Sequence, residues 1–399
     1  MDKLQDTLRQ ELLDLVENNI LKYWMEKMVD AENGGFYGRR DGNDCLDIEA
    51  PKSAVLNARI LWAFSAAYRV LGKEEYLDMA TRAYLFMESF LIDKEYGGVY
   101  WSVNSKGEPL DTKKHVYAMA VTVFALSEYV RATQNNEALE YAKGLYYNIE
   151  SMTADCTNSG YIEALSRHWH PVDDSRLSDK DELMERSLNT HLHLLEAYTN
   201  LYRVWPNTVL TQRIKNLLGV LIEKMINPDT SHIGMFFTNE WKEGKEIRSY
   251  GHSITTAWML LDAARLLENH LLIRKVAEKA ERMVETADEG LQPNGGMIYM
   301  SICEGNHLRH VEDYHWWVQA ENMLAHWYLY GYTGQQDYLS PVIKGLQFIK
   351  DHLLDHENGE WFWSWSEEKG YNRTDDKAGI WKDPCHNTRM CLQIIEDLK

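Results

Sequence analysis

Side chains that transfer protons and hold oxyanions recur at regular positions along this chain of 399 residues. His252 and His386 carry the side chain whose unperturbed pKa lies nearest neutrality, so two of them on opposite sides of a carbon can remove a proton and return one. An arginine such as Arg59 can hold the oxyanion that forms when the proton leaves. The whole set contains Arg59, Tyr117, Asn189, His193, His252, Trp316, Trp317, Glu321 and His386. These residue types are suited to proton abstraction next to a carbonyl group.

Taken singly, each of these residues has a plainer interpretation. An isolated histidine near a helix start is often a cap or a packing residue, and Asn189 could simply cap a helix. A metal site at His191 and His193 is disfavoured, because residues two apart on a helix point about 200° apart and would not share one ion. The chain holds neither a GxxxxGKS/T phosphate loop nor a GxSxG nucleophile turn. We therefore predict no metal site.

The candidates recur because the chain itself is repeated. A glycine beside aromatic or large apolar residues interrupts a helical sequence six times, at intervals of 63, 62, 74, 62 and 63 residues. A fixed period of this size indicates a repeated unit too small to bury its own apolar face, so neighbouring units must stack into one body. The marks are Gly35, Gly98, Gly160, Gly234, Gly296 and Gly359. No linker-like tract interrupts the chain, and we predict a single domain over residues 1–399.

Two helical patterns lie between successive glycine marks. In the first unit, apolar residues recur at helical spacing over Ser53–Leu71 and Glu74–Leu91. Later patterns cover Val116–Ala132, Ala138–Ser151, Thr190–Val204, Leu210–Met225, Ile254–Leu267 and Leu271–Ala287. Six such pairs predict an all-α fold, an (α/α)6 barrel with short β-hairpins between helix pairs; an open solenoid is the alternative. In a closed ring the starts of the first helices meet at one end, where helix N-termini favour a developing oxyanion.

The composition narrows the possible partners. The formal net charge of −19 repels phosphate backbones and anionic membranes, so we expect neither nucleic acid nor a membrane as a partner. The five cysteines are scattered without a CxxC pair, and the N-terminal segment is charged from Asp2, which predicts a cytoplasmic protein without a signal peptide. The 14 Trp and 23 Tyr residues suit sugar binding, because aromatic rings stack on the C–H faces of pyranoses. We expect a monomer or a weak homodimer.

Five longer motifs give the chain a resemblance to a known family. They are Gly34–Gly38, Leu56–Trp62, Asn189–Tyr198, Trp316–Glu321 and Trp381–Asn387. At these segments the sequence resembles the N-acylglucosamine 2-epimerase superfamily, and most of all the cellobiose 2-epimerases. The resemblance covers essentially the whole chain. It implies the (α/α)6 fold and a cofactor-independent enzyme that interconverts the glucose and mannose configurations at C2 of a reducing-end sugar.

The same resemblance implies roles for individual residues. After ring opening, one of His252 and His386 would take the C2 proton to give a cis-enediolate, and the other would return a proton to the opposite face. His193 would join them at the reacting sugar. The remaining predicted sugar-binding and supporting residues are Arg59, Tyr117, Asn189, Asp181, Trp316, Trp317, Glu321 and Trp381. Asp181 lies in a polar stretch, Arg167–Glu185, that accounts for the longest interval and is expected to form a loop beside the pocket.

One position departs from the family pattern. Thr255 stands where the family has a glutamate near the catalytic His252. An acidic neighbour raises the pKa of a histidine, so its loss is expected to lower the basicity of His252 and to loosen its orientation. The alternatives therefore stay open: a mannose 2-epimerase acting on monosaccharides, an aldose–ketose isomerase, a non-catalytic sugar-binding protein, or an inverting glycoside hydrolase. The hydrolase needs two carboxylates across the bond, and only Glu321 among the candidates in phase is acidic.

Overall fold

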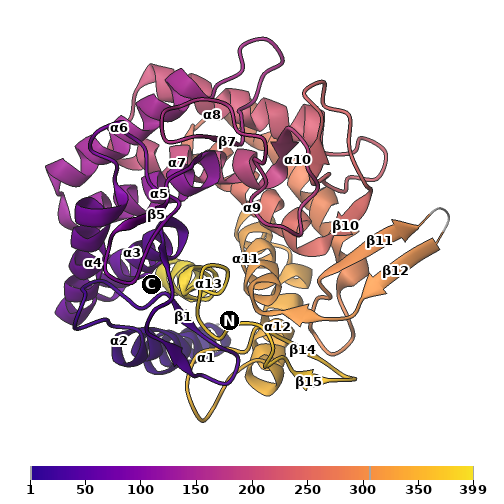
Figure 1. The fold of residues 1–399 in the computed structure, drawn as a ribbon. Coiled ribbons are helices and arrows are strands. Elements are labelled where there is room, and N and C mark those ends of the chain that lie inside the picture. Colours follow the sequence, from indigo (N-terminus) through magenta and orange to yellow (C-terminus); the bar gives the residue numbers. More distant parts are fainter. Residues whose placement is uncertain (1, 305–306, 399) are drawn as a thin grey trace.

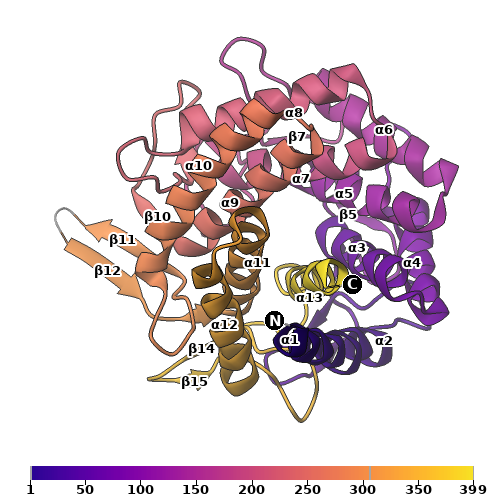
Figure 2. The same ribbon diagram turned by 180° about the vertical axis from the view of Figure 1, so that it is seen from behind.

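The computed structural model describes residues 2–304 and 307–398, which form a closed ring of helices (Figure 1). Within these residues, six inner helices surround the axis and outer helices pack around them (Figures 1 and 2). The inner helices are α3 (Ala54–Leu71), α5 (Val116–Thr133), α7 (Leu188–Val204), α9 (Tyr250–Leu266), α11 (Trp316–Thr333) and α13 (Cys385–Asp397). The outer helices are α1 (Asp2–Asp14), α2 (Lys22–Lys27), α4 (Glu74–Phe86), α6 (Asn136–Met152), α8 (Thr208–Val220), α10 (His270–Ala287) and α12 (Leu339–His352). The predicted (α/α)6 barrel is confirmed.

Short antiparallel strands link each unit to the next. The strand just before an inner helix pairs with a strand that follows the next glycine mark, as β3 (Lys52–Ser53) does with β4 (Ser102–Val103). The same arrangement joins β6 (Lys114–His115) to β7 (Ala164–Leu165), β8 (Arg186–Ser187) to β9 (Phe236–Phe237), β10 (Ile247–Ser249) to β11 (Met300–Glu304), and β13 (Tyr314–His315) to β14 (Ser364–Ser366). The other strands are β1 (Arg39–Arg40), β2 (Leu46–Asp47), β5 (Pro109–Asp111), β12 (His307–Val311) and β15 (Gly370–Tyr371). The hairpin of β11 and β12 projects from the ring (Figure 1).

Local sequence explains where the inner helices begin. Ser53, Ser187 and Ser249 stand one residue before α3, α7 and α9, and each side chain accepts a backbone N–H of the first turn. The inner helices are buried on nearly all sides, and every residue of α5 from Val116 to Val130 is buried. An outer helix such as α10 buries only one stripe and exposes the opposite face. Burial on nearly all sides therefore distinguishes the inner helices from the outer ones.

A buried ion pair follows the same repeat. Asp30 lies in the turn before the first glycine mark. Its Oδ2 is 2.7 Å from Nζ of Lys52, the residue just before the cap of α3. Asp93 and Lys114 repeat this contact at 2.7 Å in the next unit. Asp355–Lys377 and Asp155–Arg186 are the equivalent pairs later in the chain. Each pair joins the turn before a glycine mark to the segment that starts the next inner helix. Breaking such a pair would leave an uncompensated buried charge.

The two ends of the chain close the ring together. The sixth inner helix, α13, packs against α1 and the π-helical segment η1 (Leu15–Leu21), so the sixth pair is made by the first and last helices. Buried Glu360 joins the ends, because its Oε1 accepts Trp24 Nε1–H at 3.3 Å and Asn387 Nδ2–H at 2.9 Å. Lys382 pairs with the other oxygen of Glu360. The spacing of the glycine marks alone did not predict that the two ends of the chain form the sixth helix pair.

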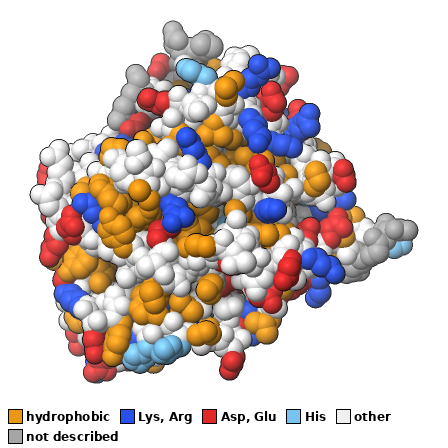
Figure 3. Space-filling view, turned by 90° about the horizontal axis from the view of Figure 1, so that it is seen from above, with side chains coloured by type: hydrophobic (Ala, Val, Ile, Leu, Met, Phe, Trp, Pro, Cys, Tyr) orange, Lys and Arg blue, Asp and Glu red, His pale blue; other side chains and the backbone are white. Residues whose placement is uncertain are grey.

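The surface carries both signs of charge. On the face shown in Figure 3, Lys and Arg side chains are interspersed with Asp and Glu among the described residues drawn there. Within residues 2–304 and 307–398, every helix is too short or too polar to cross a membrane.

Candidate active site

The starts of the inner helices bring the predicted histidines and their partners to one end of the barrel. Arg59 from α3 donates from Nη2 to the Tyr117 hydroxyl of α5 at 2.7 Å, and the Tyr117 ring lies edge-on to the His193 ring of α7, with centroids 4.8 Å apart. Arg59 Nη1 also lies 2.7 Å from Nε2 of His386 on α13. The rings of His252 and His386 both pack against Trp317, with centroids 5.0 Å and 5.9 Å from it. The predicted convergence therefore holds in space.

His386 is held by a carboxylate on one side and a guanidinium on the other. Its Nδ1 lies 2.6 Å from Glu321 Oε1, and a carboxylate only accepts, so this network assigns the proton to Nδ1. Arg59 then donates to the lone pair on Nε2. Burial lowers the pKa of His386, and Glu321 opposes that shift by favouring the imidazolium. His386 thus presents Nε2 as a base beside a donor that can hold an oxyanion.

His252 has different partners. Its Nδ1 lies 2.7 Å from Ser249 Oγ, and its Nε2 lies 3.2 Å from Oδ1 of Asn189. Burial, together with the neighbouring His193 and His386, lowers the pKa of His252 to about 3. The Thr255 hydroxyl turns away and donates to its own helix at Gly251 O, at 2.8 Å.

One part of the expectation for His252 stays a prediction and the other is wrong. The pKa of His252 is low because of burial and of the neighbouring His193 and His386, so the low value does not by itself trace to the missing glutamate. Its ring is nevertheless held at both nitrogens, by Ser249 and Asn189, so the loss of the family glutamate at Thr255 does not loosen its orientation.

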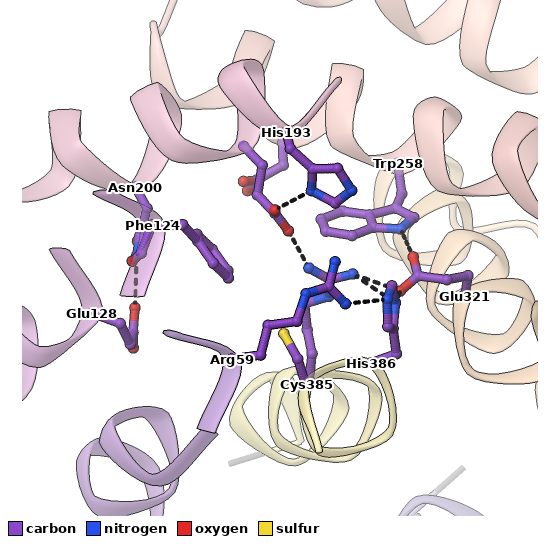
Figure 4. Close-up of polar contacts among 12 residues, drawn as sticks. Arg59, Phe124, Glu128, His193, Asn200, Trp258, Glu321, Cys385 and His386 are labelled. Carbon is purple, nitrogen blue, oxygen red and sulfur yellow. Dashed lines mark hydrogen bonds and ion pairs between the residues drawn. The ribbon is translucent and has the colours of Figure 1, made fainter. Parts of the chain in front are cut away.

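Arg389 links two of the histidines through their carboxylate partners. Figure 4 shows His193, Glu321 and His386 in this network. Arg389 pairs with Glu196 through Nη1 and with Glu321 through Nη2, the latter at 2.6 Å. Glu196 in turn accepts from His193 Nδ1 at 2.8 Å. Burial raises the pKa of Glu196, but Arg389 and His193 lower it more, to about 2. Both carboxylates thus stay ionised and fix the imidazole rings above them.

Neighbouring side chains hold the two candidate oxyanion donors, Arg59 and Tyr117, in place. Asp383 accepts from Arg59 Nη1 at 3.1 Å, which points the guanidinium across the barrel mouth. Burial raises the pKa of Tyr117 to about 12, so its hydroxyl stays protonated and can donate. Arg59 and Tyr117 are both buried but keep a small exposed fraction, 6% and 4%. Both groups are therefore fixed donors that keep a small accessible surface.

The tryptophans divide into two kinds. Trp317 and Trp381 are partly exposed; Trp381 packs 6.1 Å from Tyr117 and 6.2 Å from Trp101, between ring centroids. Trp316 differs from its predicted role as a sugar contact. It is only 1% exposed because it lies behind His386, 5.4 Å between ring centroids, and under the Lys382 ammonium. It supports the histidine and does not line the mouth.

Asp181 and Glu321 differ in how they relate to the histidines. Asp181 is partly buried in its loop and accepts the Ser178 N–H at 3.2 Å. Burial and the charge of Asp181 raise the pKa of Tyr299, whose ring centroid lies 6.1 Å from that of Trp317, and a supporting role for Asp181 stays a prediction. Glu321 has no exposed surface, so it acts through His386 and not by touching sugar. His191 faces away from His193: its Nε2 accepts the Tyr161 N–H at 3.1 Å.

Several residues of the site were not predicted from the sequence. Glu196 follows His193 by three positions, and Arg389 follows His386 by three, which places each on the same helix face as its histidine. That spacing could have identified both. Ser249 and Asp383 gave no comparable signal, because each could equally be a helix cap or a turn residue.

Comparisons with known proteins agree with this geometry. Residues 34–382 match the family described as N-acylglucosamine 2-epimerase (GlcNAc 2-epimerase). A cellobiose 2-epimerase of Bacteroides fragilis is 48% identical over 98% of this chain and all of its own length. The solved structure of cellobiose 2-epimerase from Bacillus thermoamylovorans superposes with a TM-score of 0.93 at 38% identity, covering 98% of this chain and all of that one. A D-mannose isomerase structure, at 19% identity and a TM-score of 0.82 over 100% of this chain and 98% of its own, shares the fold. The chain therefore belongs to the N-acylglucosamine 2-epimerase family.

Proposed function

We propose that the protein is a carbohydrate 2-epimerase that interconverts the glucose and mannose configurations at C2 of a reducing-end sugar, with cellobiose and related β-1,4-linked disaccharides as its substrates. The observation that carries the proposal is the placement of His252 and His386 against the same tryptophan, Trp317, with Arg59 bonded to one of them. The cellobiose 2-epimerases that are 48% and 38% identical to this chain support the choice of substrate.

In this proposal the side chains alone carry the chemistry. Once the ring of the sugar has opened, one histidine removes the C2 proton and the negative charge moves to the carbonyl oxygen. Arg59 and the Tyr117 hydroxyl stabilise that oxyanion, since both are donors already fixed at the barrel mouth. After rotation about C2–C3, the other histidine protonates the opposite face. His386 and His252 are unequal in this exchange, because only His386 is backed by a carboxylate.

Glycoside hydrolysis is disfavoured by the state of the carboxylates. An inverting hydrolase needs one protonated and one ionised acid facing each other across the glycosidic bond. Glu196 and Glu321 both pair with Arg389, and despite burial the pKa of each lies below its usual value. Neither can serve as a general acid near neutral pH. The likeness to family 76 glycoside hydrolases, at 11% identity, shows the fold alone.

An aldose–ketose isomerase is the second candidate, and the low pKa that burial gives His252 favours it. If His252, with a pKa of about 3, exchanged protons poorly, His386 would take the C2 proton and then deliver it to the neighbouring carbon, C1. A ketose would then form in place of the C2 epimer.

Proton NMR of cellobiose, mannobiose, glucose and mannose with the enzyme in D2O tests both candidates. Deuterium at C2 together with the epimeric sugar supports the 2-epimerase. Ketose formation supports the isomerase. A preference for mannose over cellobiose would move the substrate to the monosaccharides, and a cleaved glycosidic bond would overturn the proposal.

A further inference from the structure

A second cavity lies at the opposite end of the barrel from the histidines. It has a volume of about 170 Å³ and is lined by residues from the middles and C-terminal halves of the inner helices, among them Trp62, Phe124, Thr199, Tyr328 and Gln393. A single water needs only about 10–15 Å³ of such space. Pockets for drug-sized ligands reach roughly 300–1,000 Å³. The cavity is therefore large enough for several waters or one small molecule and too small for a disaccharide.

Ion pairs between neighbouring helices form the rim of this cavity. Arg69 Nε lies 2.7 Å from Glu128, which also takes Arg131 Nη1 at 2.7 Å. Arg203 pairs with Asp262 at 2.8 Å. Each rim arginine is thus already neutralised by a carboxylate, which leaves little net attraction for a free anion. The rim carboxylates are engaged in the same pairs, which likewise leaves little net attraction for a cation.

The floor of the cavity, in contrast, holds polar groups without partners. Trp62 Nε1, Thr199 Oγ1, Arg389 Nε and Gln393 Oε1 are buried, and none has a hydrogen-bond partner among the described residues. Trp62 and Thr199 are only 5% and 3% exposed, and Arg389 only 2%. Buried polar groups in proteins are nearly always hydrogen-bonded, and each one left unpaired costs about 1–3 kcal/mol. Two of the four groups only donate, one only accepts and one can do both.

We propose that this cavity is a second binding site, for a neutral polyhydroxy compound no larger than a monosaccharide. Hydroxyl groups both donate and accept, so one such molecule can satisfy the unpaired donors of Trp62 and Arg389 and the acceptor of Gln393. The aromatic faces of Phe124 and Trp258 line the cavity and can pack on its C–H groups. Arg389 and Glu196 form the wall between this cavity and the histidines, because both line the cavity while Arg389 also holds Glu321 and Glu196 also holds His193.

Calorimetry with two glycosides tests the site independently of the epimerase activity, because glycosides cannot open their rings and are not turned over. Methyl β-D-glucopyranoside is expected to bind with a stoichiometry of two, one molecule at each end of the barrel. Methyl β-cellobioside is expected to bind with a stoichiometry of one, since the rear cavity is too small for it. The double substitution Thr199→Val and Gln393→Leu should reduce the stoichiometry of the glucoside to one and leave that of the cellobioside unchanged.

The matched control acts at the other end. Trp381→Ala should weaken the cellobioside and one of the two glucoside sites, and leave the second glucoside site intact. A single glucoside site in the wild-type protein, a second site weaker than roughly 10 mM, or two sites that survive the double substitution would each overturn the proposal. A protein that binds two glucosides but shows no epimerisation would contradict the proposed function and leave the second site standing.

Discussion

Replacement of Glu321 with glutamine separates its charge from its shape. The carboxylate has no exposed surface, and it lies 2.6 Å from His386 Nδ1, from Arg389 Nη2 and from Trp258 Nε1. A glutamine fills the same volume and can still accept a hydrogen bond, but it no longer stabilises the imidazolium. A nearby opposite charge is worth about 1–3 pKa units to a histidine, or about 1.4–4 kcal/mol. We therefore expect Glu321→Gln to lower kcat for cellobiose by about 10- to 1,000-fold.

The Michaelis constant distinguishes this role from sugar binding. Glu321 is shielded from the barrel mouth by His386, so KM for cellobiose should change by less than about threefold, a difference worth under 1 kcal/mol. Trp258→Phe is the matched control, because it removes one hydrogen bond to Glu321 and keeps the charge. It should lower kcat far less. Steady-state kinetics with a thermal melt of each variant makes the comparison. A correctly folded Glu321→Gln enzyme with kcat within a factor of about three of wild type would refute this reasoning.

Three further predictions concern catalysis and stability. Thr255→Glu should raise kcat, since a carboxylate one turn from His252, the proposed base on α9, raises its low pKa; an unchanged or lower kcat in a folded variant counts against this. Lys52→Met should lower the free energy of unfolding in denaturant by about 3–5 kcal/mol, because it leaves the buried Asp30 without its cation. Lys143→Met, at a surface pair, should lower it by under about 1 kcal/mol. Equal losses would contradict the ion-pair argument. Burial lowers the pKa of His191 to about 4, so the unfolded chain binds the proton more tightly than the folded one. The free energy of unfolding should therefore fall by about 3 kcal/mol as the pH drops from about 6.5 to 4. His191→Gln should flatten that fall, and an unaltered pH dependence would exclude His191 as its source.

Most of the fold could be predicted from the sequence repeat. The intervals between glycine marks gave the number of units, and the apolar periodicity gave helices such as Ser53–Leu71, which the structure has at Ala54–Leu71. The inner helices, 13 to 18 residues long, are buried on nearly all sides along most of their length. Ring closure by α1 and α13 was not predictable in this way, because the contacts of Glu360 join residues more than 300 positions apart.

The site was predictable where chemistry and helix phase agree. His252 stands three residues past the cap Ser249 and His386 two past the cap Pro384, so both lie in the first turn of an inner helix, and their convergence followed from the ring. Trp316 and Trp317 are adjacent in sequence, and only the direction of each side chain decides that one lies behind His386 and the other beside it. Asp181 lies in an irregular loop, where no periodicity fixes the direction of a side chain.

The most direct test of the proposed two-histidine chemistry is C2 hydrogen exchange of cellobiose in D2O, followed by proton NMR for wild type and His386→Ala. The wild-type enzyme should introduce deuterium at C2 and form the mannose-configured epimer, and the variant should do neither while remaining folded. Retained C2 exchange and epimer formation in folded His386→Ala would show that His386 is not one of the two residues that move the proton.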